Sequence, residues 1–167
     1  MLDTGKILLD GGLFVIIGSL IVLGVMRFNP RLFLNKGDMP PDILAAVPPK
    51  TEAEKRQAII LGIPFLIAVV AVPFLSTLQF RQHAGGDIPF LYLVLHPFLI
   101  LLMFNLFDLF ILDFLLFCTL TPRFMVVPGT EDLAGYKDYG FHIWQHLRSV
   151  IFMALAALLI AIVVSLL

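Results

Sequence analysis

The stretch that decides the fold runs from Pro97 to Leu120 and reads PFLILLMFNLFDLFILDFLLFCTL. A helix of ~20 apolar residues crosses the ~30 Å hydrocarbon core of a bilayer, so this stretch is long enough to span a membrane. It nevertheless contains two carboxylates, Asp108 and Asp113. An ionisable group at the bilayer centre costs ~3 kcal/mol on insertion scales. We therefore expect these side chains to face other helices rather than lipid.

The composition of the 167-residue chain also indicates a membrane protein. Hydrophobic residues make up 60% and charged residues 14%, whereas a soluble domain is about half apolar and about a quarter charged. The net charge of −1 and the absence of a basic stripe argue against a nucleic-acid partner. Cys118 is the only cysteine, which excludes an intrachain disulfide.

The hydropathy pattern predicts an all-α integral membrane protein with four transmembrane helices in a bundle and two structured cytoplasmic loops. The chain is expected to form a single transmembrane domain over residues 1–167. Its helices are predicted at about 7–27, 52–79, 90–120 and 142–167, and its cytoplasmic loops at 28–51 and 121–141. Helices are expected because membrane-spanning strands require a closed barrel.

Local signals refine three of these helices. Asp3 and Asp10 lie before the first apolar core and no small-residue cleavage site follows it, so we interpret this segment as a retained helix rather than a signal peptide. Thr51 and Glu54 match a capping box at the start of the second helix. Pro97 is expected to open the third spanning helix, with residues 90–96 at the interface. The alternative is a kinked, tilted helix that begins at Phe90.

The distribution of basic residues predicts the orientation. Six basic residues lie in or next to the first long loop: Arg27, Arg31, Lys36, Lys50, Lys55 and Arg56. Three lie in or next to the second: Arg123, Lys137 and Arg148. The opposite side has only Lys6 and Arg81. The positive-inside rule places both long loops in the cytoplasm and both termini outside. We expect a bacterial inner (plasma) membrane.

Asn105, Asp108 and Asp113 are the candidate functional residues of the third helix. At ~100° per residue they fall within a sector of ~140° on an α-helix, which would form one polar flank. The structural interpretation is a pair of hydrogen-bonded carboxylates that hold helices together. The functional interpretation is a proton, ion or catalytic site.

His142 and His146 lie four residues apart in GFHIWQHLR and share a helix face. We predict that at least one lies within ~8 Å of Asp113, because neighbouring helices pack ~8–10 Å apart. Such a histidine and Asp113 would line a pocket open to the cytoplasm or the inner leaflet. Activity or partner binding would then depend on pH near neutrality, and Asp113→Asn should remove that dependence. The alternative is an interfacial band of polar and aromatic residues. Two histidines on one helix face suit a metal, but without an HExxH pattern they are a weak signal, so no metal site is assigned and metal binding stays open.

The remaining polar residues offer weaker candidates. Arg31, Arg123 and Arg148 are candidates for binding lipid headgroups. The second loop's charged and tyrosine residues are expected to be mostly solvated: Glu131, Asp132, Tyr136, Lys137, Asp138 and Tyr139. No Ser–His–Asp set lies in plausible register. His83, expected in an outer loop, and His96 do not suit a bis-histidine haem, so the cofactor remains unknown.

Three functions compete on this evidence. The first is a small accessory or transport-type subunit that uses intramembrane carboxylates. The second is a membrane-embedded enzyme acting on a lipid or isoprenoid at the cytoplasmic interface, with Asp108, Asp113, His142 and His146 as candidate catalytic residues. The third is a structural assembly factor. The lipid bilayer is the expected partner, and the chain is expected to form a homo-oligomer or to join a larger membrane complex.

Overall fold

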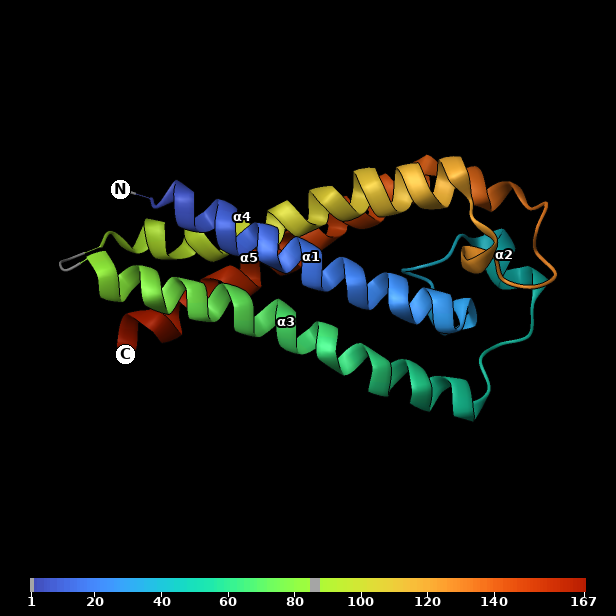
Figure 1. Ribbon diagram of the computed structural model, residues 1–167, viewed down its shortest axis with the longest axis horizontal. Coiled ribbons are helices and arrows are strands. Elements are labelled where there is room, and N and C mark those ends of the chain that lie inside the picture. Colours follow the sequence, from blue (N-terminus) through green and yellow to red (C-terminus); the bar gives the residue numbers. More distant parts are fainter. Residues whose placement is uncertain (1, 85–87) are drawn as a thin grey trace. The chain divides into compact units, whose positions relative to one another are not determined.

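The computed structural model describes residues 2–84 and 88–167, and this described part is helical and contains no β-strand (Figure 1). The elements in chain order are α1 (Thr4–Phe28), η1 (Pro30–Phe33), α2 (Pro41–Ala46), α3 (Glu52–Ala84), α4 (Phe90–Phe107), η2 (Asp108–Leu120), η3 (Arg123–Met125), η4 (Ala134–Lys137) and α5 (Tyr139–Leu166). Residues 85–87, within the expected outer loop, lie outside the described residues.

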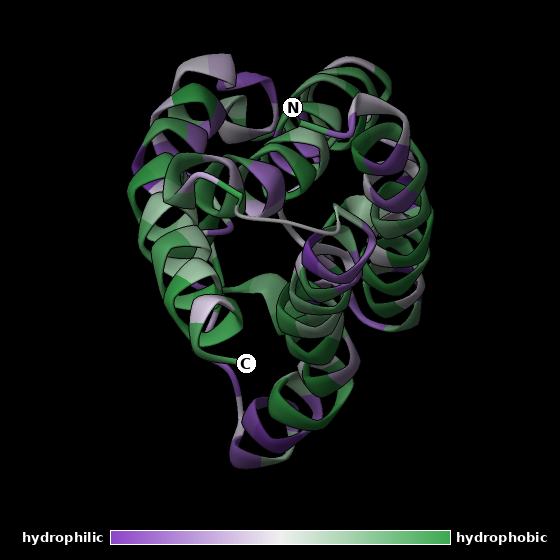
Figure 2. Cartoon of the chain, turned by 90° about the vertical axis from the view of Figure 1, so that its left-hand side faces the viewer, coloured by the Kyte–Doolittle hydropathy of each residue, from purple (hydrophilic) through white to green (hydrophobic). Residues whose placement is uncertain are grey.

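Four helical segments are long and apolar enough to cross a membrane, as predicted. They are Thr4–Phe28, Glu52–Ala84, Phe90–Leu120 and Tyr139–Leu166, and the third comprises α4 and η2 together. Hydrophobic residues cover most of the helical ribbon (Figure 2). Large apolar side chains such as Leu66, Leu91 and Phe152 are exposed on these helices. In a bilayer such side chains contact lipid, so their exposure needs no other partner.

Two local predictions about the helices were wrong. Pro97 is buried inside the third helix instead of opening it. The helix begins at Phe90, in agreement with the predicted bounds of about 90–120 and with the alternative of one long helix. A proline within a transmembrane helix is tolerated because neighbouring groups can satisfy the backbone carbonyl that its missing N–H leaves open. His83 lies in the last turn of α3 rather than in a loop, with its Nδ1 2.7 Å from the Gln79 carbonyl oxygen.

The N-terminal caps of α3 and α5 explain where these helices start. The predicted capping box is confirmed: the Thr51 N–H donates to Glu54 Oε2 at 2.7 Å, and the Glu54 N–H donates to Thr51 Oγ1 at 3.2 Å. At α5 the Phe141 N–H donates to Asp138 Oδ1 at 2.9 Å. This cap lets α5 begin at Tyr139, three residues before the expected start.

The chain divides into two compact units. Unit 1 contains Met1–Gly18, Leu66–Phe107 and Leu147–Leu167, and unit 2 contains Ser19–Phe65 and Asp108–His146. A buried cluster in unit 1 consists of Phe80, Leu93, Ile160, Ala161 and Val164. Ala157 and Ala161 lie four residues apart on α5 and are fully buried in this unit. Small residues at this spacing allow helices to pack closely.

The core of unit 2 is built largely from the two long loops. Its buried members are Met26, Leu34, Met39, Ile43, Phe117, Cys118, Met125, Val127 and Tyr136. The short helix α2 packs beside η4, and the Gly135 N–H donates to Asp42 Oδ2 at 2.7 Å (Figure 1). The loops therefore pack against each other and against the end of η2, which fixes the surroundings of Asp113.

Candidate functional site

The segment that carries Asp108 and Asp113 is a π-helix of 13 residues. Its hydrogen bonds join residues five apart, and the Thr121 N–H continues this pattern by donating to the Leu116 carbonyl at 2.7 Å. Residues five apart lie ~140° from each other on an α-helix. In a π-helix each turn holds more residues, so residues five apart lie closer together around the axis than in an α-helix. The π-helix therefore brings Asp108 and Asp113 onto one face, a closer arrangement than the sequence predicted.

The first two turns of α5 present His142 and His146 to this face. Asp113 Oδ2 lies 2.9 Å from His142 Nδ1 and 2.9 Å from His146 Nε2. Asp108 Oδ2 lies 3.9 Å from His146 Nε2. The predicted approach of a histidine to Asp113 within ~8 Å is thus confirmed for both histidines.

The hydrogen atoms at this site follow from the geometry. When Asp113 is ionised, its carboxylate has no hydrogen to donate, so both ring nitrogens that face Oδ2 must donate. His142 then carries a proton on Nδ1 and His146 carries one on Nε2. His142 Nε2 is buried and has no hydrogen-bond partner among the described residues. The rings of Phe117 and Phe141 lie edge-to-face with His142, with centroids at 5.1 and 5.3 Å.

Burial makes the protonation of these four residues interdependent. The side chains of Asp108, Asp113, His142 and His146 expose 27%, 22%, 5% and 11% of their surface. Adding or removing one proton changes the field on the other three groups, because charges this close are poorly screened away from water. Asp38 from the first loop also acts on Asp113 through its charge.

A metal is a weaker interpretation of the same geometry. Both imidazole nitrogens point at one carboxylate oxygen at hydrogen-bond distance, whereas a metal would lie between its ligands and bind each of them. Among the described residues no group of three or more His, Cys, Asp or Glu side chains forms such a set. The arrangement is suited to sharing and moving protons.

The first loop contacts α5 beside this site. Gln145 Nε2 donates to the Lys36 carbonyl at 3.1 Å. Asn35, the residue before Lys36, joins two further loop residues. Its Nδ2 donates to Asp38 Oδ2 at 2.7 Å, and its Oδ1 accepts from Lys50 Nζ at 2.6 Å. Partial burial lowers the pKa of Lys50. These bonds hold the loop backbone from Asn35 to Asp38 next to the titratable residues.

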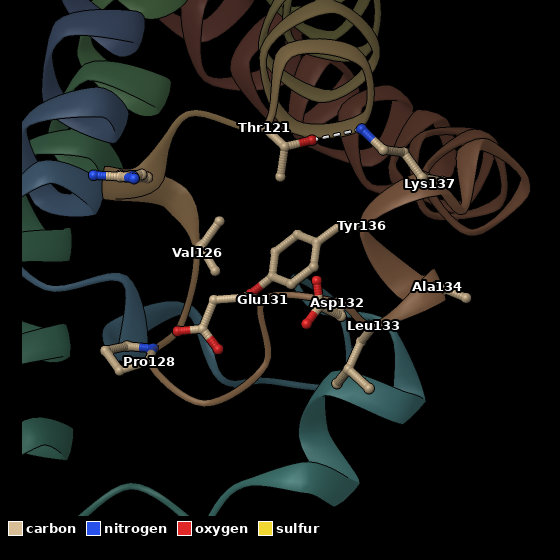
Figure 3. A pocket seen from close by; sticks show the side chains of 10 residues that line it. Thr121, Val126, Pro128, Glu131, Asp132, Leu133, Ala134, Tyr136 and Lys137 are labelled. Carbon is tan, nitrogen blue, oxygen red and sulfur yellow. Dashed lines mark hydrogen bonds between the residues drawn. The ribbon is translucent and has the colours of Figure 1, made fainter.

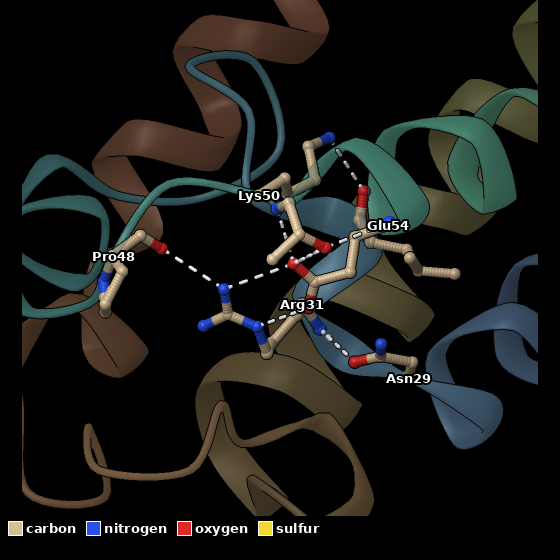
Figure 4. A network of polar contacts seen from close by, with 7 residues as sticks. Asn29, Arg31, Pro48, Lys50 and Glu54 are labelled. Atoms are coloured by element: carbon tan, nitrogen blue, oxygen red, sulfur yellow. Dashed lines mark hydrogen bonds and ion pairs between the residues drawn. The ribbon is translucent and has the colours of Figure 1, made fainter.

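The candidate headgroup arginines have different surroundings. Arg31 Nε pairs with Glu54 Oε1 at 2.5 Å, and its Nη2 donates to the Pro48 carbonyl at 3.2 Å (Figure 4). The hydrogen bond to Glu54 raises the pKa of Arg31. Arg31 thus joins the first loop to α3, whereas Arg123 and Arg148 are exposed. A headgroup role remains a prediction and suits the two exposed arginines better.

A cavity of about 710 Å³ lies in the second loop (Figure 3). It is lined by residues that include Thr121, Arg123, Glu131, Tyr136 and Lys137. None of Asp108, Asp113, His142 and His146 lines it, so the expected pocket beside Asp113 stays a prediction.

One of two polar residues near this cavity was misjudged from the sequence. Tyr136 is buried, and its hydroxyl accepts the Val127 N–H at 2.8 Å. Lys137 Nζ donates to the Cys118 carbonyl at 2.6 Å and to Thr121 Oγ1 at 2.7 Å. Tyr136 was expected in solvent, and nothing in the local sequence indicates its distant partner. Lys137 is exposed, as expected, although its ammonium group binds the end of η2.

A second polar cluster, in unit 1, was missed entirely. Ser76 Oγ donates to Asp10 Oδ2 at 2.5 Å and lies 2.9 Å from His96 Nε2, and Lys6 Nζ pairs with Asp10 Oδ2 at 2.8 Å. No Ser–His–Asp set was expected from the sequence, yet these residue types do meet. Their order is Asp–Ser–His, with the hydroxyl in the middle, so the histidine does not activate Ser76 as in a hydrolase.

Asn105 also lies in unit 1 and binds a neighbouring helix. Its Nδ2 donates to Ser149 Oγ at 2.6 Å. Its side chain is buried, as expected for a polar residue that faces other helices.

Comparisons with protein-family models, with curated proteins and with solved structures find no match to this chain.

Proposed function

We propose that this protein is a small accessory or transport-type membrane subunit that takes up and releases protons at Asp108, Asp113, His142 and His146. The observation that carries the proposal is the pair of 2.9 Å contacts from one Asp113 oxygen to two histidines. Both partners lie on segments long and apolar enough to span a membrane. Intramembrane ionisable groups are costly and mark proton or ion pathways.

The chemistry of the four residues fits this role. Histidine is the side chain whose ordinary titration range lies nearest to neutral pH. Two carboxylates and two imidazoles this close influence one another's protonation. Each proton taken up is therefore a property of all four groups together and not of one residue. Asp108 lies 3.9 Å from the nitrogen of His146 that also faces Asp113. The charge of His146 therefore acts on both carboxylates, although only Asp113 is within hydrogen-bond distance of it.

The orientation belongs to the same proposal. We propose that both long loops lie in the cytoplasm and both termini outside, because basic residues are concentrated at the loops. The membrane in this proposal is a bacterial inner membrane. Asp113 and the histidines then lie toward the cytoplasmic side. The enzyme alternative would need a substrate pocket at Asp113, and the cavity in the second loop is lined by other residues. The assembly-factor alternative predicts that the four residues only hold helices together.

Infrared spectroscopy of the protein in lipid nanodiscs tests the proposal. We expect the carboxyl bands of the site to respond when the pH is varied between about 5 and 8, the range in which a histidine side chain ordinarily changes charge. Asp113→Asn should remove or shift this signal, because it removes the acceptor of both histidines. Asp132→Asn is the matched control, since Asp132 is an exposed loop carboxylate. It should leave the signal unchanged.

Two outcomes would overturn the proposal: no titration in this range, or the same titration in the Asp113→Asn variant. A proton-flux assay in vesicles loaded with a pH-sensitive dye then separates the two forms of the proposed function. Flux above that of empty vesicles identifies a transporter that works alone. A titrating site without flux identifies an accessory subunit.

A further inference from the structure

A chain of polar contacts in unit 1 begins at a partly exposed ion pair and ends at a buried histidine. The side chains of Lys6 and Asp10 expose 19% of their surface each. Ser76 is 3% exposed and His96 is 0% exposed. Lys6 Nζ also donates to Gln79 Oε1 at 2.7 Å, which fixes the ammonium beside α3. A row of polar side chains therefore leads from the partly exposed ion pair to the fully buried His96.

The hydrogen bonds of this chain have a defined direction. The Ser76 hydroxyl has one hydrogen and donates it to Asp10 Oδ2. It can then only accept from His96 Nε2, so this nitrogen carries a proton. The opposite nitrogen, His96 Nδ1, is buried without a partner among the described residues. The Phe80 ring stacks on the imidazole with centroids 4.7 Å apart and planes 2° apart.

We propose that Asp10, Ser76 and His96 form a proton relay, in which the Ser76 hydroxyl passes protons between the Asp10 carboxylate and the buried His96 imidazole. This site is separate from the one proposed above and does not depend on it. A hydroxyl is suited to the central position because it accepts and donates a hydrogen bond at once. The relay gives a buried imidazole a route for exchanging its proton with solvent.

The transfer step balances without any further reactant. The proton on His96 Nε2 of an imidazolium moves to Ser76 Oγ, while the Ser76 hydroxyl proton moves to Asp10 Oδ2. The products are a neutral imidazole with its proton on Nδ1 and a protonated Asp10, which releases its proton to solvent. His96 takes up a proton by the same steps in reverse: Asp10 passes a proton to Ser76 Oγ, and the Ser76 hydroxyl passes one to His96 Nε2. The charged groups that act on His96 are Lys6, Asp10 and Asp3, all near the N-terminus.

A purely structural role for the cluster makes a different prediction. Hydrogen bonds that only hold α1, α3 and α4 together would affect stability but not the rate at which His96 exchanges its proton. The distinguishing quantity is therefore the exchange rate of the His96 ring N–H with solvent. It is measured by nuclear magnetic resonance on the full-length protein in nanodiscs with ¹⁵N-labelled histidine. His96→Gln assigns the signal among the four histidines.

Ser76→Ala should slow exchange at His96 by about tenfold or more, because it deletes a positioned proton donor and acceptor. Ser76→Thr keeps a hydroxyl and should restore exchange. Thr77→Val is the matched control, since Thr77 is also buried but donates to the Pro73 carbonyl of its own helix. It should leave exchange unchanged.

Asp10→Asn provides a second test if Ser76→Ala fails to fold. The amide has nearly the shape of the carboxyl group but cannot take up the proton, so exchange should slow in the same way. Exchange at the wild-type rate in whichever of these two variants folds would overturn the relay. The readout is His96 itself, so a failure here leaves the proposal for Asp113 standing, and the reverse also holds.

Discussion

At the scale of single residues, the contact between the two loops depends on one glycine. A Cβ atom at Gly135 would collide with the Asp42 carboxylate, which accepts the Gly135 N–H. The exposed Asp42 side chain would have to move away, so Gly135→Ala should destabilise the protein by about 0.5–1.5 kcal/mol, the usual net contribution of one hydrogen bond. Denaturant unfolding in detergent measures the change. Gly37→Ala is the control, because nothing lies within 4 Å of a Cβ there. Equal stabilities for the two variants would contradict the prediction.

Glu131 gives a pH-dependent prediction at the same scale. The Gly129 N–H donates to Glu131 Oε1 at 3.0 Å, and this bond holds the pKa of Glu131 below its usual value. A carboxyl group with a lowered pKa stabilises the fold above its ordinary pKa of about 4.3 and loses that contribution as the pH falls. The protection of the Gly129 amide against hydrogen exchange should drop on acidification. In Glu131→Gln the protection should stay constant with pH, and a parallel drop there would refute the argument.

At the scale of elements, the end of η2 depends on a lysine from the second loop. Thr121 follows the helix with a φ of 45°, a strained conformation for a β-branched residue. Lys137 Nζ donates to the Cys118 carbonyl and to Thr121 Oγ1 at this end (Figure 3). The lysine thus binds a carbonyl that the helix leaves without an internal donor, and it supplies positive charge where the helix dipole is negative.

Lys137→Met should therefore destabilise the protein by about 1.5–3 kcal/mol, the usual range for a hydrogen bond to a charged group. Hydrogen exchange of the amides from Cys118 to Thr121 should accelerate. Lys36→Met, at an exposed lysine of the first loop, is the control and should change neither quantity. Unchanged exchange at the end of η2 in Lys137→Met would show that the lysine does not hold this end.

At the scale of the whole molecule, the distribution of basic residues predicts the topology. Cys118 is fully buried, so the native chain should give little labelling by a thiol reagent. His83→Cys and Lys36→Cys place thiols at exposed positions in the last turn of α3 and in the first loop. If the basic loops lie inside, as the positive-inside rule predicts, a membrane-impermeant maleimide added to spheroplasts should label His83→Cys directly and Lys36→Cys only after permeabilisation. The reverse pattern would invert the topology.

The sequence by itself determined the features that depend on short stretches of chain. Hydropathy over ~20 residues identified the four candidate spans, and Thr51 with Glu54 identified the start of α3. It also singled out Asp113, His142 and His146, because polar residues in or next to an apolar span need partners. The predictions of the spans and of the start of α3 succeeded because the relevant energies arise within one helix or one turn.

Only the tertiary structure decided how the polar residues combine. Asp113 and His146 are 33 positions apart, and Ser76 and Asp10 are 66 apart, so their contacts depend on how each helix is rotated about its axis. The rotation of α4 and η2 could not be read from the sequence, since their apolar residues surround the helix on every side. The π-helical geometry of η2 was equally hidden, and it is what places Asp108 and Asp113 on one face. The hydrophobicity of a span determines that it lies in the membrane. Packing against other helices determines its rotation, and with it which of its few polar residues contact one another.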